Sequence, residues 1–230
     1  MRMIVVFEKG LVLRHIGHLD LMRSIQRALR RSGLPVRYSN GFNPHIQLSF
    51  ASPLSVGVAG MREVMDIPLE SECDEAEFTQ TLARAMPAPL KVRRARAVPD
   101  TFPTLMALVA GSNIRMELDA GQAADAVAAA LPPFMASDDC VALRKTKSGE
   151  NSTNIRPFVT QASVEPSGTG YTLRCVIANR AEGSLKPSVL MKALCDLAGV
   201  EAVPYLAYRD AILARAGDGA LIALEEYPYV

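Results

Sequence analysis

The order of apolar segments in the first 100 residues is the feature that most constrains the fold. It predicts six elements in the order strand, helix, strand, strand, helix, strand. The first helix is the clearest of them, because Met22, Ile25 and Leu29 repeat at intervals of three and four and Gly33 with Pro35 ends the pattern. The predicted elements cover residues 2–7, 18–31, 45–50, 62–69, 74–86 and 90–98.

This element order matches the split βαβ arrangement of ferredoxin-like domains, in which both helices cover one face of an antiparallel sheet. We expect Pro132 and Pro133 to end a helix in the second half, and residues 207–230 stay unassigned. The sequence predicts an α+β protein of two ferredoxin-like halves with antiparallel sheets, residues 1–100 and residues 101–230. The elements predicted in the second half are strands at residues 114–118, 141–145, 155–164 and 171–178 and helices at residues 123–131 and 187–197.

The overall composition excludes several classes of protein. The formal net charge is +1, from 25 basic and 24 acidic residues, so no global field attracts nucleic acid or anionic lipid and any electrostatic site is local. The apolar run at residues 3–7 is too short for the core of a signal peptide or a membrane span. We therefore expect a cytoplasmic protein with no membrane partner.

The four cysteines are spaced too widely for a metal or redox motif. No CxxC pair occurs, and no closely spaced triplet is available to hold an iron-sulfur cluster. Such cysteines are ordinarily small buried apolar side chains. We therefore expect no cofactor and no metal in this chain. The cysteines are Cys73, Cys140, Cys175 and Cys195.

Residues 14–37 concentrate positive charge in one chemical form. They contain six arginines, no lysine and a single carboxylate, that of Asp20. On a helix over residues 18–31, four of the arginines fall within roughly a third of the circumference, opposite the apolar residues. Guanidinium groups form paired hydrogen bonds to phosphate oxygens and stack on bases, so this face predicts a phosphate-rich ligand. The six are Arg14, Arg23, Arg27, Arg30, Arg31 and Arg37.

A plainer interpretation of the arginine-rich helix is a solvated amphipathic face. Asp20 could pair with Arg23, and other acidic residues could approach from elsewhere in the fold. The consistent choice of arginine over lysine favours ligand binding, because a merely solvated face has no reason for that choice. The sequence alone leaves both interpretations open.

All three histidines, His15, His18 and His45, lie in or beside this segment. A three-histidine metal site is chemically conceivable, but the spacing matches no standard ligand set. The loop at residues 39–45 combines turn formers, side-chain amides and an aromatic, as binding loops do, although its Asn side chains could simply bond their own backbone. We predict that the helix start and this loop share a surface cleft. The predicted cleft residues are His18, Asp20, Ser39, Gly41 and Phe42, and the predicted ligand contacts in the loop are Asn43 and His45.

A second basic segment follows Arg144. Lys145, Lys147 and Arg156 lie around a glycine turn and could contact phosphate at the tip of a hairpin. Exposed hairpins carry such cations for solubility just as readily, so the two interpretations are balanced. Phosphate-loop, dinucleotide-binding and nucleophile-elbow patterns are missing, and no catalytic residue is assigned.

Several ordered motifs resemble those of one known family. HLDLMRSIQRALRRSGLPVRYSNGFNPH, followed by SPLSVG, LRKTKSG and NIRPF, is similar to the radical-SAM-linked family of uncharacterised bacterial proteins. The similarity covers most of the chain and is strongest over residues 1–70. Members look like partners of radical-SAM proteins, fused to them in some chains and adjacent in others. The resemblance implies a radical-SAM protein as partner and little mechanism.

Two positions depart from the family pattern. Ile46 stands where relatives usually have a second proline, and Thr153 with Asn154 stands where they usually have an acidic pair. The second departure removes any carboxylate role at that position. The lack of a closely spaced cysteine triplet agrees with the resemblance, because it assigns radical chemistry to another polypeptide.

We therefore expect a non-catalytic accessory module that recognises RNA, either tRNA or ribosomal RNA, for a radical-SAM enzyme that modifies it. One alternative is a protein-interaction subunit whose arginine face docks on an acidic partner. Another is an enzyme that uses His15, His18 and His45. Whether the chain catalyses any reaction itself stays open on the sequence.

Overall fold

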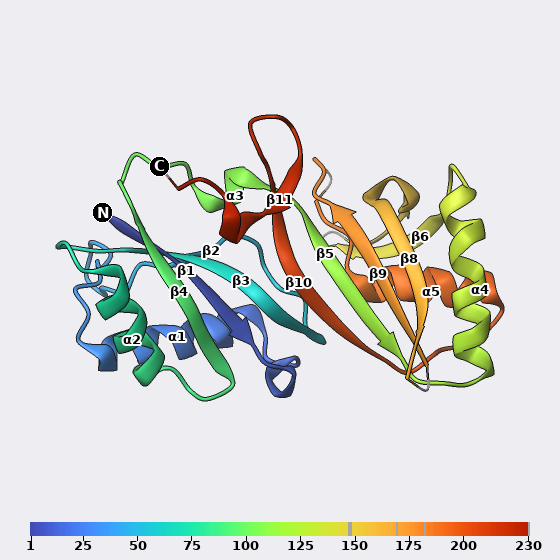
Figure 1. Cartoon of the computed structure of the whole chain (residues 1–230), viewed down its shortest axis with the longest axis horizontal. Coiled ribbons are helices and arrows are strands. Elements are labelled where there is room, and N and C mark those ends of the chain that lie inside the picture. The colour runs from blue at the N-terminus through green and yellow to red at the C-terminus, as the bar shows by residue number, and fades with distance from the viewer. Residues whose placement is uncertain (147–148, 169, 182, 230) are drawn as a thin grey trace. The chain divides into compact units, whose positions relative to one another are not determined.

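The computed structural model describes residues 1–146, 149–168, 170–181 and 183–229 and has a mixed α+β fold (Figure 1). The chain forms two compact units. Unit 1 comprises Met1–Val109 together with the segment that begins at Arg209, and unit 2 comprises Ala110–Tyr208. The division expected after residue 100 placed the last segment of the chain in the second half, whereas in the structure this segment belongs to unit 1.

The sheet of unit 1 is antiparallel and has β1 (Arg2–Lys9) at its centre. β1 pairs with β3 (Val58–Pro68) on one side and with β4 (Leu90–Val98) on the other. The other edge of β3 pairs with β2 (Ser49–Phe50) and adjoins β10 (Tyr205–Arg215), whose part in unit 1 begins at Arg209. β11 (Leu221–Ala223) pairs with the end of β10.

Both long helices of unit 1 cover the same face of its sheet, as predicted. Met3, Val5 and Phe7 alternate along β1 toward this face and pack with the apolar residues of α1 (His18–Ser32) and α2 (Glu75–Ala85). α1 ends at Gly33, which adopts a left-handed conformation with φ of 71°. Asp74 begins α2, because its carboxylate accepts the backbone N–H groups of Ala76 and Glu77.

The opposite face of this sheet has its own apolar core. Ile4 and Val64 pack there with residues of α3 (Leu105–Leu108) and of the last segment, which includes η3 (Leu224–Glu226). The Tyr229 hydroxyl donates a 2.6 Å hydrogen bond to the carbonyl of Leu224 within this segment, and both side chains pack into this core. Residues that the sequence left unassigned therefore complete the second face of unit 1.

In unit 2, β9 pairs antiparallel with β5 on one side and with β8 on the other. A separate two-stranded hairpin consists of β6 and β7. The elements of this part of the chain are β5 (Val109–Leu118), α4 (Gln122–Ala136), β6 (Val141–Thr146), β7 (Gly149–Asn154), η2 (Arg156–Phe158), β8 (Val159–Ser167), β9 (Gly170–Ala178) and α5 (Pro187–Ala198).

Three local predictions were wrong. α4 continues through Pro132 and Pro133, because its buried side chains extend to Phe134 and the fixed φ of proline is compatible with a helix despite the lost N–H. Residues 155–158 are not a strand, since the Asn154 side chain accepts the backbone N–H groups of Cys140 and Arg156 and turns the chain. The strand expected at residues 45–50 is reduced to the two residues of β2.

None of the helices in the described part of the chain is both long and apolar enough to cross a lipid bilayer.

Candidate nucleic-acid interface

The solvent face of α1 carries the predicted arginines. Leu21, Ile25, Ala28 and Leu29 are buried on one side of the helix. The opposite side is exposed, as the intervals of three and four require. The arginines on this side are Arg23, Arg27, Arg30 and Arg31.

Two of these arginines already have partners. Arg23 pairs with Asp20 at 3.3 Å, and both side chains are about two-thirds exposed, so the pair contributes little to stability. Arg31 donates a 2.8 Å hydrogen bond to the carbonyl of Ala85, the last residue of α2. Arg27 and Arg30 have no hydrogen-bond or ion-pair partner among the described residues. Their guanidinium groups are therefore available to a ligand.

The flanking arginines are engaged within unit 1. Arg14 donates to the carbonyl of Leu11 at 3.3 Å, and Arg37 donates to the carbonyl of Leu69 at 2.9 Å. Arg37 also pairs with Asp100, whose carboxylate binds the N-terminal amine at 3.2 Å. Hydrogen bonds from that amine and from Arg37 lower the pKa of Asp100 below its ordinary value. Arg14 and Arg37 thus hold the fold around α1.

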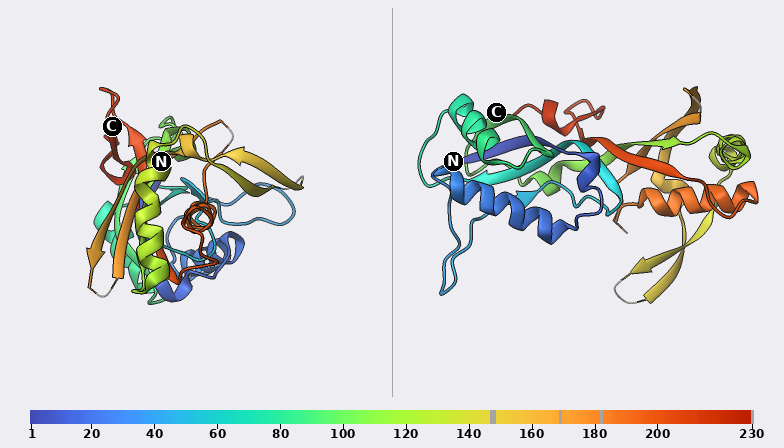
Figure 2. Two further views of the ribbon diagram at one scale, coloured as in Figure 1. Left: turned by 90° about the vertical axis from the view of Figure 1, so that its right-hand side faces the viewer. Right: turned by 90° about the horizontal axis from the view of Figure 1, so that it is seen from below.

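The chain between α1 and β2 forms a loop that projects from unit 1 (Figure 2). An antiparallel bridge joins Tyr38 to Ile46 at its base. Inside this bridge, the Ser39 hydroxyl lies 2.8 Å from Nδ1 of His45 and accepts the backbone N–H of His45 at 3.1 Å. Gly41 has φ of 120°, a conformation that glycine adopts without strain. Ser39 and His45 therefore close the neck of the loop.

The tip of this loop presents an aromatic ring to solvent. Phe42 has a relative exposure of 111%, the highest among the exposed large hydrophobic side chains of the described residues. Asn40 and Asn43 beside it are also exposed. Gln26 of α1 donates a 2.8 Å hydrogen bond to the carbonyl of Ile46 and holds the loop base against the helix. The Phe42 ring thus lies on a loop whose base is bonded to Gln26, the residue before Arg27 in α1.

The predicted cleft is tested only in part by these contacts. The His18 ring packs edge-on against Phe50 at 5.1 Å between centroids, while Asp20 is exposed beside Arg23. His45 bonds to Ser39. No described contact joins these two groups, so a single shared cleft stays a prediction.

The three histidines do not form a metal site in the described part of the chain. No group of three or more His, Cys, Asp or Glu residues there is arranged to hold a metal ion. His15 is exposed and has no described partner. The structure thus gives no specific support to the histidine-based enzyme.

The second basic segment is only partly described. Lys147 lies outside the described residues, and Lys145 is described by its backbone in β6. Arg156 donates to the carbonyls of Val159 at 2.5 Å and Met135 at 2.8 Å, and it lies over the ring of Phe134. Arg156 is therefore committed to contacts within unit 2.

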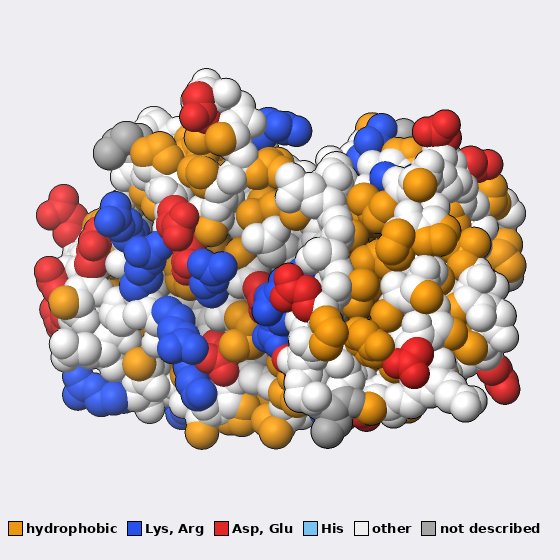
Figure 3. Space-filling view, turned by 45° about the vertical axis from the view of Figure 1, so that its right-hand side comes forward, with side chains coloured by type: hydrophobic (Ala, Val, Ile, Leu, Met, Phe, Trp, Pro, Cys, Tyr) orange, Lys and Arg blue, Asp and Glu red, His pale blue; other side chains and the backbone are white. Residues whose placement is uncertain are grey.

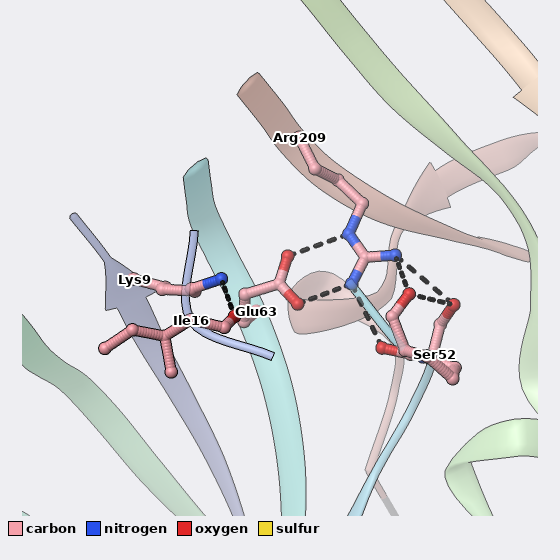
Figure 4. Close-up of polar contacts among 6 residues, drawn as sticks. Lys9, Ile16, Ser52, Glu63 and Arg209 are labelled. Atoms are coloured by element: carbon pink, nitrogen blue, oxygen red, sulfur yellow. Dashed lines mark hydrogen bonds and ion pairs between the residues drawn. The ribbon is translucent and has the colours of Figure 1, made fainter. Parts of the chain in front are cut away.

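A buried group of charged residues in unit 1 was not anticipated from the sequence (Figure 4). Arg209 forms a paired ion bridge to Glu63, at 2.8 Å and 2.5 Å, and donates to the carbonyls of Ser52 and Pro53 at 3.0 Å and 3.2 Å. Lys9 donates to the carbonyl of Ile16 at 3.0 Å.

The Lys9, Glu63 and Arg209 group lies in the interior of unit 1 and does not face solvent. These residues are 1%, 2% and 5% exposed, respectively. Burial lowers the pKa of Lys9, the nearby Glu63 carboxylate raises it, and Arg209 lowers it further. Because the three residues are separated by many positions in the sequence, spacing alone does not signal their contact.

Four cations on β4 were not among the predicted site residues. Lys91, Arg93, Arg94 and Arg96 are exposed, and Figure 3 shows Lys and Arg side chains gathering on one side of unit 1. Residues 90–98 were predicted as a strand, and the alternation of charged with apolar residues along a strand puts the charged side chains on one face.

Comparison with protein-family models found a match over residues 2–187, which include α1, the projecting loop and β4. The matching model is described as "Uncharacterized protein conserved in bacteria (DUF2344)". A search among curated proteins found no match. Because the match spans most of its length, this chain belongs to the DUF2344 family of uncharacterised bacterial proteins.

Proposed function

We propose that this protein is a non-catalytic accessory module that binds single-stranded segments of a structured RNA, tRNA or ribosomal RNA, for a radical-SAM enzyme that modifies it. The observation that carries the proposal is Phe42, a fully exposed ring on a loop whose base is bonded to Gln26 of α1, the helix that bears Arg27 and Arg30. An exposed aromatic ring and exposed guanidinium groups on the same unit suit a ligand that has both bases and phosphates.

Each part of this surface has a separate chemical task. The Phe42 ring offers a stacking surface to an unpaired base, which is worth about 1–3 kcal/mol per base. Arg27 and Arg30 offer paired donors to phosphate oxygens. Asn40 and Asn43 carry amide donors and acceptors suited to base edges.

The radical-SAM partner rests on the family resemblance of the motifs at residues 18–45. In this proposal the partner enzyme performs the radical chemistry, and this chain binds the RNA. We also infer that each unit is ferredoxin-like. In unit 1 the strand order β4, β1, β3 with both helices on one face supports this, and in unit 2 the order β5, β9, β8 does so.

The test is the affinity of the full chain for a fluorescently labelled, unstructured 20-nucleotide RNA, measured by anisotropy. Phe42→Ala should weaken binding by roughly 5-fold to 150-fold, the loss of one stacked base. Leu197→Ala, which removes a 55% exposed apolar side chain from unit 2, is the matched control and should bind as the wild type does. Equal affinity of wild type and Phe42→Ala would overturn the assignment of this loop.

A second candidate is docking on a protein partner. Four exposed apolar side chains, those of Val12, Ile16, Leu19 and Val56, lie near the start of α1. The N–H of Gly57 donates to the carbonyl of Arg14 at 2.7 Å and brings the loop at Val56 close to the others. Loss of capture of a purified radical-SAM protein by Leu19→Asp, with RNA affinity unchanged, would favour this role for the patch.

A further inference from the structure

The four cations of β4 lie on the sheet face opposite the helices. Antiparallel neighbours share a face, and Arg94 is opposite Val6 while Arg96 is opposite Ile4. Ile4 belongs to the apolar core on the face away from α1 and α2. Lys91, opposite Glu8, has the same orientation. These three side chains therefore point away from the arginine helix.

A bulge adds the fourth cation to this face. The pairing register of β1 with β4 shifts by one residue at this point. Val6 is opposite Arg94, but the next residue, Phe7, is opposite Val92, so Arg93 is an extra residue in β4. Arg93 reaches Glu8, on the same face as Lys91. Without the bulge, Arg93 would alternate to the helix-covered face. The bulge thus brings four cations together over six residues, a length of about 17 Å.

Acidic residues do not neutralise this surface, which we call the β4 cation row: Lys91, Arg93, Arg94 and Arg96. Glu8 is shared by Lys91 and Arg93, and Arg94 donates to the backbone carbonyl of Glu225. The Glu225 carboxylate itself pairs with Arg62 at 2.7 Å. Arg96 has no hydrogen-bond or ion-pair partner in the described part of the chain. Among the described residues, the Glu8 carboxylate pairs with two of the four cations, and no carboxylate pairs with Arg94 or Arg96.

Protection of a sheet edge is the usual reason for cations on an edge strand. Here α2 already performs that task. The backbone N–H of Ala95 donates to the Thr79 hydroxyl at 3.0 Å, and that of Ala97 donates to the Glu75 carboxylate at 2.8 Å. Since α2 occupies these edge donors, another strand cannot use them, and the cation row requires a different explanation.

We infer that the β4 cation row binds the phosphate backbone of single-stranded RNA, as a second contact surface on the sheet face opposite the α1 arginines. Side chains two residues apart on one strand face are about 6.6 Å apart, a spacing close to that of successive phosphates in an extended strand. The inference rests on the proposed RNA-binding function and extends its footprint. The end of α2, which Arg31 contacts, leads within a few residues into β4, so one RNA strand can reach both surfaces.

The experiment compares the salt dependence of RNA affinity for two double variants of the full chain. Arg94→Gln with Arg96→Gln should lower the slope of log affinity against log salt by about 1.4, because each phosphate contact on a single strand contributes about 0.7. Lys186→Gln with Lys192→Gln removes the same charge from unit 2 and should leave the slope unchanged. Arg94→Lys with Arg96→Lys keeps the charge and should restore the slope.

The outcomes separate this inference from the proposed function. If Phe42→Ala weakens RNA binding but Arg94→Gln with Arg96→Gln keeps the wild-type slope, the β4 inference fails and the function stands. If the wild type binds no RNA, both fail. A slope lowered equally by the unit 2 control would also overturn the inference, because it would indicate a general effect of charge. Thermal melting of each variant checks that it is folded.

Discussion

Arginine performs opposite tasks in two regions of unit 1. Arg209 is buried, makes a paired bridge to Glu63 and donates to two backbone carbonyls. Arg27 and Arg30 are exposed and have no partner among the described residues. A buried guanidinium requires partners for its donors, since an unpaired charge in the interior is strongly unfavourable. The exposed pair needs none for folding, so it is free to bind a ligand.

The largest expected effect is at Arg209. Arg209→Met should lower the free energy of unfolding by roughly 3–5 kcal/mol, because it leaves the buried Glu63 carboxylate unpaired. Urea denaturation measures this loss. Arg209→Met combined with Glu63→Met should recover much of it, since well-packed apolar side chains replace buried ion pairs at little cost. A single variant that loses under about 1 kcal/mol would contradict the stabilising role of the bridge.

Arg156 sharpens the comparison, because the sequence suggested that it contacts phosphate. Arg156→Met should lower stability by about 2 kcal/mol, since two backbone carbonyls lose a charged donor. The slope of log RNA affinity against log salt should not change. The comparison for a general loss of charge is Arg174→Met, which removes an exposed arginine from β9 of the same unit. A stable Arg156→Met variant with a reduced salt slope would show that Arg156 contacts phosphate after all.

Lys9 should give a smaller effect that depends on pH. Burial lowers its pKa below 10.5, so the folded protein releases this proton at a lower pH than the unfolded chain does. Between the folded pKa and 10.5 the unfolded chain holds more protons, and the contribution of Lys9 to stability rises with pH. The stability difference, wild type minus Lys9→Met, should therefore increase across this window.

The measurement for Lys9 is urea denaturation of wild type and variant at several pH values from 7 to about 10.5. Subtracting the two curves removes contributions that both proteins share, such as burial of the Cys175 thiol, which raises its pKa to about 12. Lys186→Met, at an exposed lysine of unit 2, is the matched control for the loss of a lysine side chain. A wild-type advantage that falls as pH rises would mean that Lys9 gains a charged partner in the fold.

The smallest stability effect is expected on the α1 face. Replacing Arg27 and Arg30 together by Gln should change stability by under about 1 kcal/mol per residue, because exposed charges contribute little to folding. The same change should lower the salt slope of RNA affinity by about 1.4, from about 3 if four α1 arginines contact phosphates. A loss of several kcal/mol would show that these arginines hold the fold, and an unchanged slope would move docking on a protein ahead.

The elements of unit 1 were predictable where local pattern determined them. The apolar repeat predicted α1, and the apolar run at residues 3–7 predicted β1. Both elements end within two residues of the predicted positions. The face of α1 that bears Arg27 and Arg30 followed from the same repeat. Local patterns failed where a distant segment decided the outcome, as for the β10 strand that brings Arg209 to Glu63.

Site residues show the same limit. Arg156 donates to the carbonyls of Val159 and Met135. The carbonyl of Met135 is far from Arg156 in the sequence and comes close to it only in the folded chain. The cation row depends on a bulge at Arg93, which the sequence does not mark with a glycine or any other local signal. Phe42 was identified as a loop residue, but its full exposure is a property of the folded loop.

The chain path of the two units has a consequence for the order of events during synthesis. Unit 2 is continuous from Ala110 to Tyr208, whereas unit 1 is interrupted by it. As the chain leaves the ribosome, the residues of unit 2 are complete before Arg209 has been made, and Glu63 must wait for its partner until Arg209 emerges. A released chain that ends at Tyr208 should therefore contain a protected unit 2 and a protease-sensitive unit 1.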